Sequence, residues 1–434
     1  MDVNKGYEIA IIGCGPAGGC LAALLSLRGF RVLVFDDEKR PDLLVGESLL
    51  PPVVNLMRRL EIEDRVKAFS QHKPGVGFIH RGGLRLDFLF PEKSLGDTPN
   101  YSYNVPRPKF DELLRERAEE LGATFVKRRA EVETGDGTKE LRLSDACLAA
   151  TPELDGKHPK LLIDATGRAR LFARTLGIPA RRGGRNDLAY FAHFENFDPG
   201  SSVDGQVVLS ILDHGWSWRI PLPGKLSVGV VIDKAAAAKH GTGAAERLEA
   251  LIDAEPILRE AGKNRRRVSE VMTYTNYQQI SERGHGPGWI SIGDAYGFVD
   301  PMLSPGLFMA MLTAEKLDQQ AFSAGRSILD HPKRLMAHFK SVEDEMKDWH
   351  DAWGEIIEYF YDGRIFSLYE GGSKLSQTYQ KWAIPSIVER HLSRQLTRIV
   401  SGVSTRKRYG RQLVAFATKR LIWDTQPPEF YAVR

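Results

Sequence analysis

The chain has 434 residues, of which 42% are hydrophobic and 27% charged, and its formal net charge is +4. This is the composition of a folded globular protein, and the length suits more than one domain. No uninterrupted apolar run approaches the roughly 20 residues that a membrane-spanning helix needs, so no membrane span is expected.

The cysteines and the first residues bear on the cellular setting. Cys14, Cys20 and Cys147 show neither the spacing of a metal site nor a disulfide framework. Residues 1–6 lead directly into the first predicted strand, without the basic segment, apolar core and cleavage site of an export signal. We therefore expect a reducing, cytoplasmic environment.

The chain opens with a predicted strand, a glycine turn and a helix. A mostly apolar run at residues 7–12 precedes a Gly-x-Gly-x-x-Gly turn, and residues 17–27 have helical character. In such a unit the glycines allow a tight turn and close approach to a pyrophosphate, which lies at the positive helix N-terminus. The candidate binding residues of this turn are Gly13, Gly15, Pro16, Ala17 and Gly18.

An acidic residue follows at the spacing that a dinucleotide site requires. The apolar run at residues 32–35 ends in Asp36, about 20 residues beyond the turn, where an acid binds the ribose hydroxyls. Asp36 is therefore the candidate for the adenosine ribose. A glycine turn alone can be coincidental, but the strand, helix and acid together predict a bound dinucleotide, without deciding between NAD and FAD.

Four later motifs favour FAD. They are Gly46-Glu47-Ser48, Arg107 in Val-Pro-Arg-Pro-Lys-Phe-Asp, Asp-Ala-Thr-Gly at 164–167, and Gly293-Asp294 after a predicted strand at 289–292. In this order they resemble the FAD monooxygenase superfamily built on the p-hydroxybenzoate hydroxylase plan. The resemblance implies FAD as cofactor, O2 as co-substrate, and cofactor binding by these motifs, with Asp294 accepting hydrogen bonds from cofactor hydroxyls. Taken singly, Gly293-Asp294 also suits an ordinary turn, and Arg107 a solvated surface arginine.

Within that superfamily, residues 7–320 most resemble the flavin-dependent halogenase branch. The branch's Trp-x-Trp-x-Ile-Pro and Phe-x-x-Pro-x-x-Ser-x-Gly patterns are matched by Trp216, Trp218, Ile220 and Pro221, and by Phe298, Pro301, Ser304 and Gly306. The resemblance places Pro301, Gly306 and Leu307 at the cofactor.

Lys73 falls about where the branch keeps its catalytic lysine. In a halogenase, a flavin hydroperoxide oxidises bound halide, and the hypohalous acid formed reaches a lysine near the substrate. A partly buried lysine has a shifted pKa and useful amine chemistry, so Lys73 is a candidate catalytic residue. The surrounding Gln-His-Lys-Pro-Gly also suits a polar turn.

The chain departs from the branch at the halide site. Halogenases have Ser-Thr-Gly or Ser-Ser-Gly where this chain has Ser304, Pro305 and Gly306, and main-chain N–H groups there hold the anion. Pro305 has no N–H to donate. Leu303 also replaces the glutamate of tryptophan halogenases. We therefore expect weakened halide binding and direct oxygen transfer, which is aromatic hydroxylation.

Trp216 and Trp218 are two residues apart, so in a strand they face the same side. Two indoles on one face suit either the wall of an oxygenase pocket or a packed core. In halogenases these tryptophans are credited with keeping substrate away from the flavin, which counts against hydroxylation.

Three functions are therefore open. The favoured one is an FAD-dependent monooxygenase acting on an electron-rich ring, including a tryptophan side chain in a partner protein during tryptophylquinone cofactor biogenesis. The alternatives are a flavin-dependent halogenase of indoles, phenols or pyrroles, and a reductase of the geranylgeranyl reductase type. The resemblance implies that electrons come from NAD(P)H, either directly or through a reductase partner. No second Gly-x-Gly-x-x-Gly turn is present, which favours an external reductant.

The expected fold is α/β: a Rossmann-like FAD-binding domain of the glutathione reductase type, a β-sheet substrate domain and a helical C-terminal region. The boundaries are 1–70, 105–185 and 280–330 for the FAD domain, 71–104 and 186–279 for the substrate domain, and 331–434 for the helices. Substrate-domain strands are predicted at 84–90, 188–194, 206–212, 216–221, 226–231 and 269–280, with helix at 235–261.

The C-terminal region is strongly basic. Between residues 374 and 434 there are twelve lysines and arginines against three acidic residues. A basic face could recruit an acidic protein or an anionic substrate, or could be a solvated helix surface. No nucleic-acid-binding motif accompanies the charge, so nucleic acid is not an expected partner.

Overall fold

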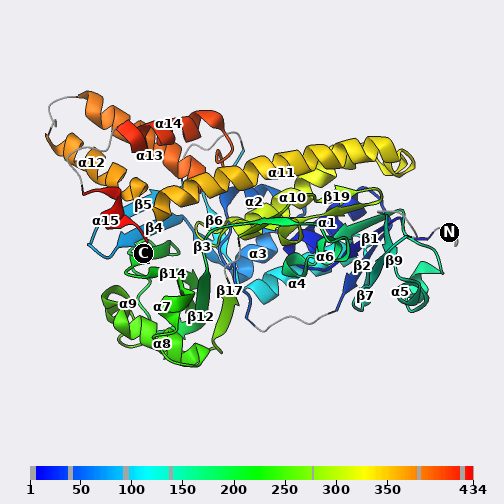
Figure 1. Cartoon of the computed structure of the whole chain (residues 1–434), viewed down its shortest axis with the longest axis horizontal. Helices are drawn as coiled ribbons and strands as arrows, with labels where there is room; N and C mark the ends of the chain where they lie inside the picture. The colour runs from blue at the N-terminus through cyan, green and yellow to red at the C-terminus, as the bar shows by residue number, and fades with distance from the viewer. Residues whose placement is uncertain are drawn as a thin grey trace.

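Two large sheets and a long helix organise the molecule (Figure 1). The computed structural model describes residues 6–37, 43–90, 97–135, 140–275, 278–378, 383–420 and 426–433. The expected α/β class, with its C-terminal helices, is confirmed.

The first sheet carries the glycine turn. Its order is β19-β20-β10-β1-β2-β7, and all neighbours except β19 and β20 run parallel. The strands are β1 (Ile9–Ile12), β2 (Val32–Asp36), β7 (Thr124–Lys127), β10 (Leu161–Asp164), β19 (His285–Gly286) and β20 (Trp289–Ser291). One face packs on α1 (Pro16–Leu27), α4 (Arg107–Glu120) and α10 (Pro305–Ala321). The other packs on β8 (Val132–Thr134), β9 (Leu141–Leu143), α5 (Asp145–Ala149) and α6 (Leu171–Thr175).

The glycines between β1 and α1 are required by contact. Gly13 has φ +99°, a left-handed conformation that favours glycine. A Cβ at Gly18 would lie 2.0 Å from the carbonyl oxygen of Gly13. The turn is therefore tight because both positions lack a side chain.

The second sheet has the order β16-β12-β15-β14-β13-β4-β5, with β17 beside β12. Its strands are β4 (Gly75–His80), β5 (Arg85–Leu89), β12 (Asp187–Glu195), β13 (Val207–Leu212), β14 (Gly215–Leu222), β15 (Lys225–Asp233), β16 (Arg266–Arg267) and β17 (Met272–Thr275). Successive side chains alternate between faces, so Phe191, Trp216 and Trp218 enter the main core. Tyr190 and Phe194 face a second core beneath the helices that follow β15.

Two elements differ from expectation. The helix expected at 235–261 is divided into α7 (Lys234–Ala237), α8 (Ala244–Ala254) and α9 (Pro256–Ala261), because Gly241 has φ +106° and Pro256 begins a new helix. The single strand expected at 269–280 is wrong: β17 and β18 (Gln279–Ser281) belong to different sheets, and residues 276–277 lie outside the described residues.

Small elements connect the two large sheets. β18 lies between β11 (Ala180–Arg182) and β21 (Gly297–Phe298). β3 (Gln71–Lys73) pairs with β6 (Ser102–Asn104), and the short helices α2 (Pro51–Arg59) and α3 (Glu63–Phe69) precede β3.

The long helix α11 (Pro332–Tyr361) crosses the molecule, packing on α10 and β19 (Figure 1). It leads to α12 (Arg364–Thr378), α13 (Ala383–Val400), α14 (Arg408–Arg420) and α15 (Pro428–Tyr431). Its Phe360 stacks on Phe78 of β4, with ring centroids 4.5 Å apart. One hydrophobic core thus includes Ile9, Trp216 and Phe360, from all three expected domains, whose boundaries stay a prediction.

Within the ranges described, no helix combines the length and the apolar composition that crossing a membrane requires.

The Phe360 contact should contribute strongly to stability. Phe360 is fully buried, so Phe360→Ala should lower the free energy of unfolding by about 3–5 kcal/mol through lost burial and a cavity. Phe416→Ala is the control, because that ring is 58% exposed, and it should change stability by less than about 0.5 kcal/mol. Urea denaturation of both variants measures this, and equal losses would contradict it.

Candidate active site

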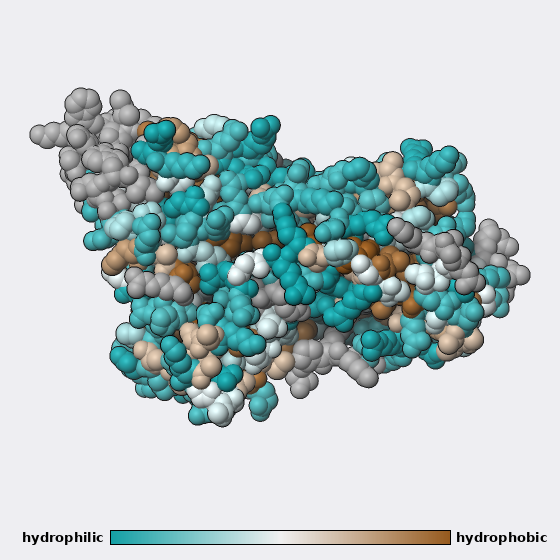
Figure 2. Space-filling model, in the orientation of Figure 1, coloured by the Kyte–Doolittle hydropathy of each residue, from teal (hydrophilic) through white to brown (hydrophobic). Residues whose placement is uncertain are grey.

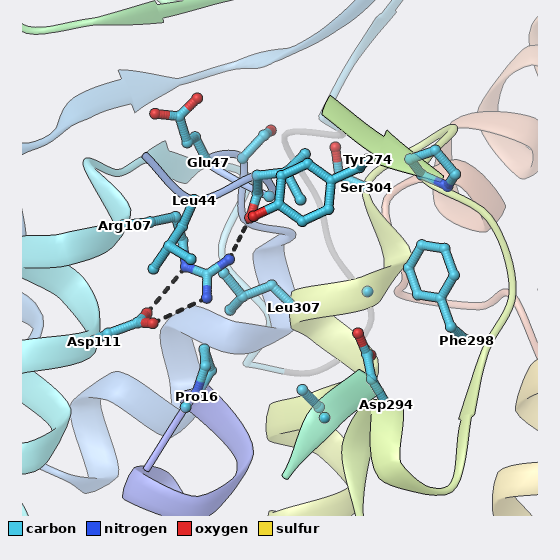
Figure 3. Close-up of a pocket in the computed structure, with 18 of the residues that line it drawn as sticks. Pro16, Leu44, Glu47, Arg107, Asp111, Tyr274, Asp294, Phe298, Ser304 and Leu307 are labelled. Atoms are coloured by element: carbon cyan, nitrogen blue, oxygen red, sulfur yellow. Dashed lines mark hydrogen bonds and ion pairs between the residues drawn. The ribbon is translucent and has the colours of Figure 1, made fainter. Parts of the chain in front are cut away.

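A cavity of about 340 Å³ lies where the two large sheets meet (Figure 3). Figure 2 shows hydrophobic side chains gathered in a band across the middle of the visible face, with mostly hydrophilic residues on either side. The cavity is lined by thirteen of the residues selected from the sequence: Gly15, Pro16, Ala17, Glu47, Ser48, Arg107, Trp216, Trp218, Asp294, Pro301, Ser304, Gly306 and Leu307. Residues as far apart in the chain as Pro16 and Trp216 therefore line one site.

The other selected residues do not line the cavity. Gly13 lies in the turn before α1, Gly18 in the first turn of α1, and Gly293 directly before the lining residue Asp294; Pro305 stands between the lining residues Ser304 and Gly306. Asp36 ends β2 beside the end of β1, and its ribose-binding role stays a prediction. Lys73 lies behind the cavity-lining segment that includes Glu47 and Ser48.

The N-terminus of α1 faces the cavity with its unsatisfied N–H groups. Gly15 is the N-cap, Pro16 opens the helix, and the first turn carries no acidic side chain. A Cβ at Gly15 would meet nothing within 4 Å, so space for a ligand reaches the backbone. Such a helix end fits a pyrophosphate.

Arg107 ties the start of α4 to the segment before Glu47. Its guanidinium forms two 3.0 Å hydrogen bonds with Asp111 and also donates to the carbonyl oxygen of Val45 (Figure 3). The Arg107 side chain is 13% exposed, so the alternative of a solvated surface arginine is wrong. Arg107 fixes the 45–48 segment at the cavity edge.

Asp294 presents an acceptor to the cavity. Burial raises the pKa of its carboxyl group to about 6, against the opposing charges of Arg168 and Arg107. A Cβ at Gly293 would lie 3.0 Å from Cβ of Ala17, so this turn packs directly on the start of α1. A partly buried carboxylate suits the hydroxyls of a dinucleotide, and the adjacent helix N-terminus suits its phosphates.

Sequence reasoning did not find the partner of Glu47. Nε2 of His193, on β12, lies 2.7 Å from Oε1 of Glu47, and both side chains are buried. This pair joins the cofactor-side segment to the second sheet. The only signal in the sequence was a histidine inside a strand whose alternate residues are apolar.

Trp216 and Trp218 lie on one face of β14, as their spacing predicts, with ring centroids 5.9 Å apart. Both are at least 95% buried and both line the cavity, so they serve as wall and core at once. The Trp218 indole N–H donates to Ser227 Oγ at 3.2 Å, and the Trp216 indole N–H donates to Oη of Tyr361 at 2.9 Å. Tyr274 and Phe298 complete the aromatic lining (Figure 3).

The N-terminus of α10 also reaches the cavity. Leu303 and Ser304 take left-handed backbone angles, φ 67° and 57°, and Pro305 is the first helical residue. Because proline has no N–H, the donors that this end offers the cavity are those of Gly306 and Leu307. An anion there has one donor fewer than a Ser-Thr-Gly start would supply.

Lys73 is not in a polar turn, and that alternative is wrong. It ends β3 and is 2% exposed, and its ammonium group donates to the carbonyl oxygen of Leu49 at 2.8 Å. Burial lowers its pKa to about 7, so near neutral pH a large fraction is the free amine. The amine bonds to Leu49, which directly follows the cavity-lining Ser48.

The family profile of tryptophan halogenase matches residues 8–91 and 87–361. Tryptophan 2-halogenase of Chondromyces crocatus is 30% identical over 72% of this chain, which spans 60% of that longer protein. A brominase of 1H-pyrrole-2-carbonyl groups on a peptidyl-carrier protein, from Pseudoalteromonas luteoviolacea, is 28% identical over 85% of this chain and 89% of its own length.

Solved structures agree in fold. The flavin-dependent brominase Bmp2 has a TM-score of 0.75 at 23% identity, covering 96% of this chain and 98% of that chain. A variant of halogenase PltM in complex with FAD has a TM-score of 0.71 at 17% identity, covering 96% and 91%.

The chain belongs to the tryptophan halogenase family. The preference for hydroxylation over halogenation is not supported by these relatives, which favour the halogenase alternative. No relative described above concerns peptidyl tryptophan hydroxylation.

The raised pKa of Asp294 gives a pH test in FAD-free protein. Because the native state holds this proton more tightly than the unfolded chain, the stabilisation present below about pH 4 is lost as pH rises through about 6. Asp294→Asn should therefore raise the melting temperature at pH 7, by an amount that shrinks toward pH 4, while weakening FAD binding. Thermal melts from pH 4 to 8 with a flavin titration measure both effects.

Asp97→Asn, at an exposed position, is the control and should show neither effect. A pH-independent gain for Asp294→Asn, or unchanged FAD affinity, would contradict the assignment.

Proposed function

We propose that this chain is an FAD-dependent monooxygenase that transfers oxygen directly to an electron-rich aromatic ring held on a partner protein. The observation that carries the proposal is Pro305 at the first position of α10, between the cavity-lining Ser304 and Gly306, where any other residue would add an N–H to this helix start. Halogenation is the second candidate, and the names of the relatives favour it.

The lining residues fit FAD. The N-terminus of α1 would receive the pyrophosphate, Asp294 would accept hydrogen bonds from cofactor hydroxyls, and Arg107 would hold the 45–48 segment against the cofactor. Bound and reduced, FAD activates O2. The electrons would come from NAD(P)H, used directly or through a reductase.

The balance between the two reactions depends on how much free energy of halide binding is lost with the missing N–H donor. Losing one hydrogen bond to a desolvated anion costs about 1–3 kcal/mol. That lowers halide affinity by about fivefold to over a hundredfold. The helix dipole and the N–H groups of Gly306 and Leu307 remain, so halide binding would be weakened and not abolished.

Two observations favour the second candidate. The indoles of Trp216 and Trp218 line the cavity, as the resemblance to halogenases implies. Lys73 has a pKa of about 7, so its amine can accept halogen or donate a hydrogen bond. The amine would have to leave the Leu49 carbonyl oxygen to do so.

A protein-borne substrate is supported by one relative and by α14. That relative brominates a group on a peptidyl-carrier protein. On α14, exposed side chains fall in one arc of about 120° at 100° per residue: Arg408, Tyr409, Gln412, Phe416, Lys419 and Arg420. Tyr409 and Phe416 are 60% and 58% exposed. A basic face with protruding aromatic rings suits an acidic protein, whether a carrier or a protein whose own tryptophan is hydroxylated.

The product distinguishes the reactions. FAD-loaded enzyme given a reductant, labelled O2 and bromide, with indole, phenol and a tryptophan-containing peptide, should yield product with labelled oxygen whether or not bromide is present. Mass spectrometry reads the label. A bromine isotope pair as the main product would overturn the proposal, and product formed without O2 would point to a reductase.

Pro305→Thr tests the cause, since it restores one N–H at the same helix position. The brominated fraction should rise by about tenfold or more, in line with one regained hydrogen bond to the anion. Adding Lys73→Met to Pro305→Thr should remove the brominated product and leave FAD bound. An unchanged brominated fraction in Pro305→Thr would show that the missing N–H does not control halide use.

The α14 face can be tested by charge reversal. Arg408→Glu with Lys419→Glu should raise KM for pyrrole-2-carbonyl on a peptidyl-carrier protein by about tenfold at low salt and leave turnover of free indole unchanged, because the encounter is electrostatic. Lys333→Glu with Arg334→Glu, exposed at the start of α11, is the matched control. Equal effects of both pairs would remove α14 as the docking face.

A further inference from the structure

The last residue of α11 places a hydroxyl behind the aromatic wall. Tyr361 is 8% exposed, and its Oη accepts the indole N–H of Trp216 at 2.9 Å. The same hydroxyl donates to the Asp300 carboxylate, whose two oxygens lie 3.2 and 3.3 Å away. One hydroxyl therefore joins the second sheet to the segment before α10.

Asp300 organises that segment. It is fully buried and accepts the Met302 N–H at 2.9 Å and the Gln278 side-chain amide at 2.9 Å. Directly after Met302, Leu303 and Ser304 adopt left-handed angles, which are strained for residues other than glycine. The Asp300 contacts help to hold this strained turn, and the turn sets where α10 begins.

We infer that Tyr361 is a positioning residue that fixes the Trp216 indole relative to the N-terminus of α10, and so the width of the site between aromatic wall and cofactor. This rests on the proposed function only in that the site oxidises an aromatic substrate; it holds for oxygen transfer and for halogenation alike. Trp216, Ser304, Gly306 and Leu307 line the cavity, whereas Tyr361 is not among its lining residues.

The surroundings of Tyr361 determine which of its two hydrogen bonds the hydroxyl donates and which it accepts. The Arg185 guanidinium lies 3.9 Å from the ring centroid and is paired with Asp187. Burial, followed by the charge of Asp300, raises the pKa of Tyr361 well above its ordinary value. The hydroxyl stays protonated, so it donates to Asp300 and accepts from Trp216.

The same helix supplies a matched control. Tyr359 is 6% exposed, and its hydroxyl donates to Glu355 at 2.9 Å, away from the cavity lining. Tyr359→Phe removes a hydroxyl from a buried ring of α11 without touching Trp216 or Asp300. A role that was only structural would give the two variants similar effects.

The experiment compares Tyr361→Phe and Tyr359→Phe in full-length, FAD-loaded enzyme with indole as probe. Tyr361→Phe should lower the fraction of consumed O2 recovered in product by about fivefold to tenfold, with a matching rise in hydrogen peroxide, because the freed indole opens the site. FAD affinity should be unchanged. Tyr359→Phe should match wild type.

A double-mutant cycle tests whether the effect passes through the indole. We call the fraction of consumed O2 recovered in product the coupling of the enzyme. In a Trp216→Phe background, Tyr361→Phe should lower this coupling by less than about twofold further, because the indole N–H that Tyr361 accepts is already absent. The emission of Trp216, taken as wild type minus Trp216→Phe, should shift in Tyr361→Phe and not in Tyr359→Phe. Asp300→Asn weakens the hydrogen bond that Tyr361 donates, so it should also lower coupling. This variant replaces Tyr361→Phe in the test if Tyr361→Phe does not fold.

Unchanged coupling and unchanged Trp216 emission in Tyr361→Phe would overturn the inference, as would full additivity with Trp216→Phe. If no variant, wild type included, forms product from indole, the proposed function fails with that substrate, while peroxide release and Trp216 emission still decide the role of Tyr361.

Discussion

Two helices, α1 and α10, direct their N-termini into one cavity, and the rest of the site is arranged around that convergence. Each end contributes unsatisfied N–H groups and a partial positive charge, so an anionic cofactor is stabilised from two directions. The close approach of these elements depends on Gly293, because a Cβ at this position would lie only 3.0 Å from Cβ of Ala17 on α1 and 3.4 Å from Cβ of Ala310 on α10. The parallel order of β20, β10 and β1 brings the carboxyl ends of these strands to the same edge, where cofactors bind in such sheets.

The start of α10 is a compromise between helix stability and ligand binding. Proline is favoured at the first helical position because its φ is already helical and the N–H it lacks would have no partner within the helix. In this chain Pro305 stands between the cavity-lining Ser304 and Gly306, so the residue that suits the helix also leaves this end with one N–H fewer beside the cavity. Family membership alone therefore does not determine which anion or oxidant this end serves.

What the sequence could predict depended on the range of the interaction. The β1–turn–α1 unit follows from local glycine geometry, and the shared face of Trp216 and Trp218 follows from the two-residue period of a strand. The Glu47–His193 and Trp216–Tyr361 contacts join residues 146 and 145 positions apart, and no local pattern specifies them. The polar-turn alternative for Lys73 failed for the same reason: its neighbours in sequence are polar, but Lys73 is buried in the strand β3, which pairs with the distant β6.

The C-terminal helices contact the site, although none of their residues that the structure describes lines the cavity. The end of α11 reaches Trp216 through Tyr361, and Arg411 of α14 is paired with Glu355 six residues before Tyr361. Six residues span about 9 Å of helix. The ion pair between α14 and α11 is therefore about 9 Å along α11 from Tyr361, which bonds to Trp216. A partner docked on α14 would thus bear on a helix that is packed on α10 and bonded to the second sheet. Packed elements move together. A partner bound to α14 would therefore influence the position of Trp216, and so the width of the site, through α11.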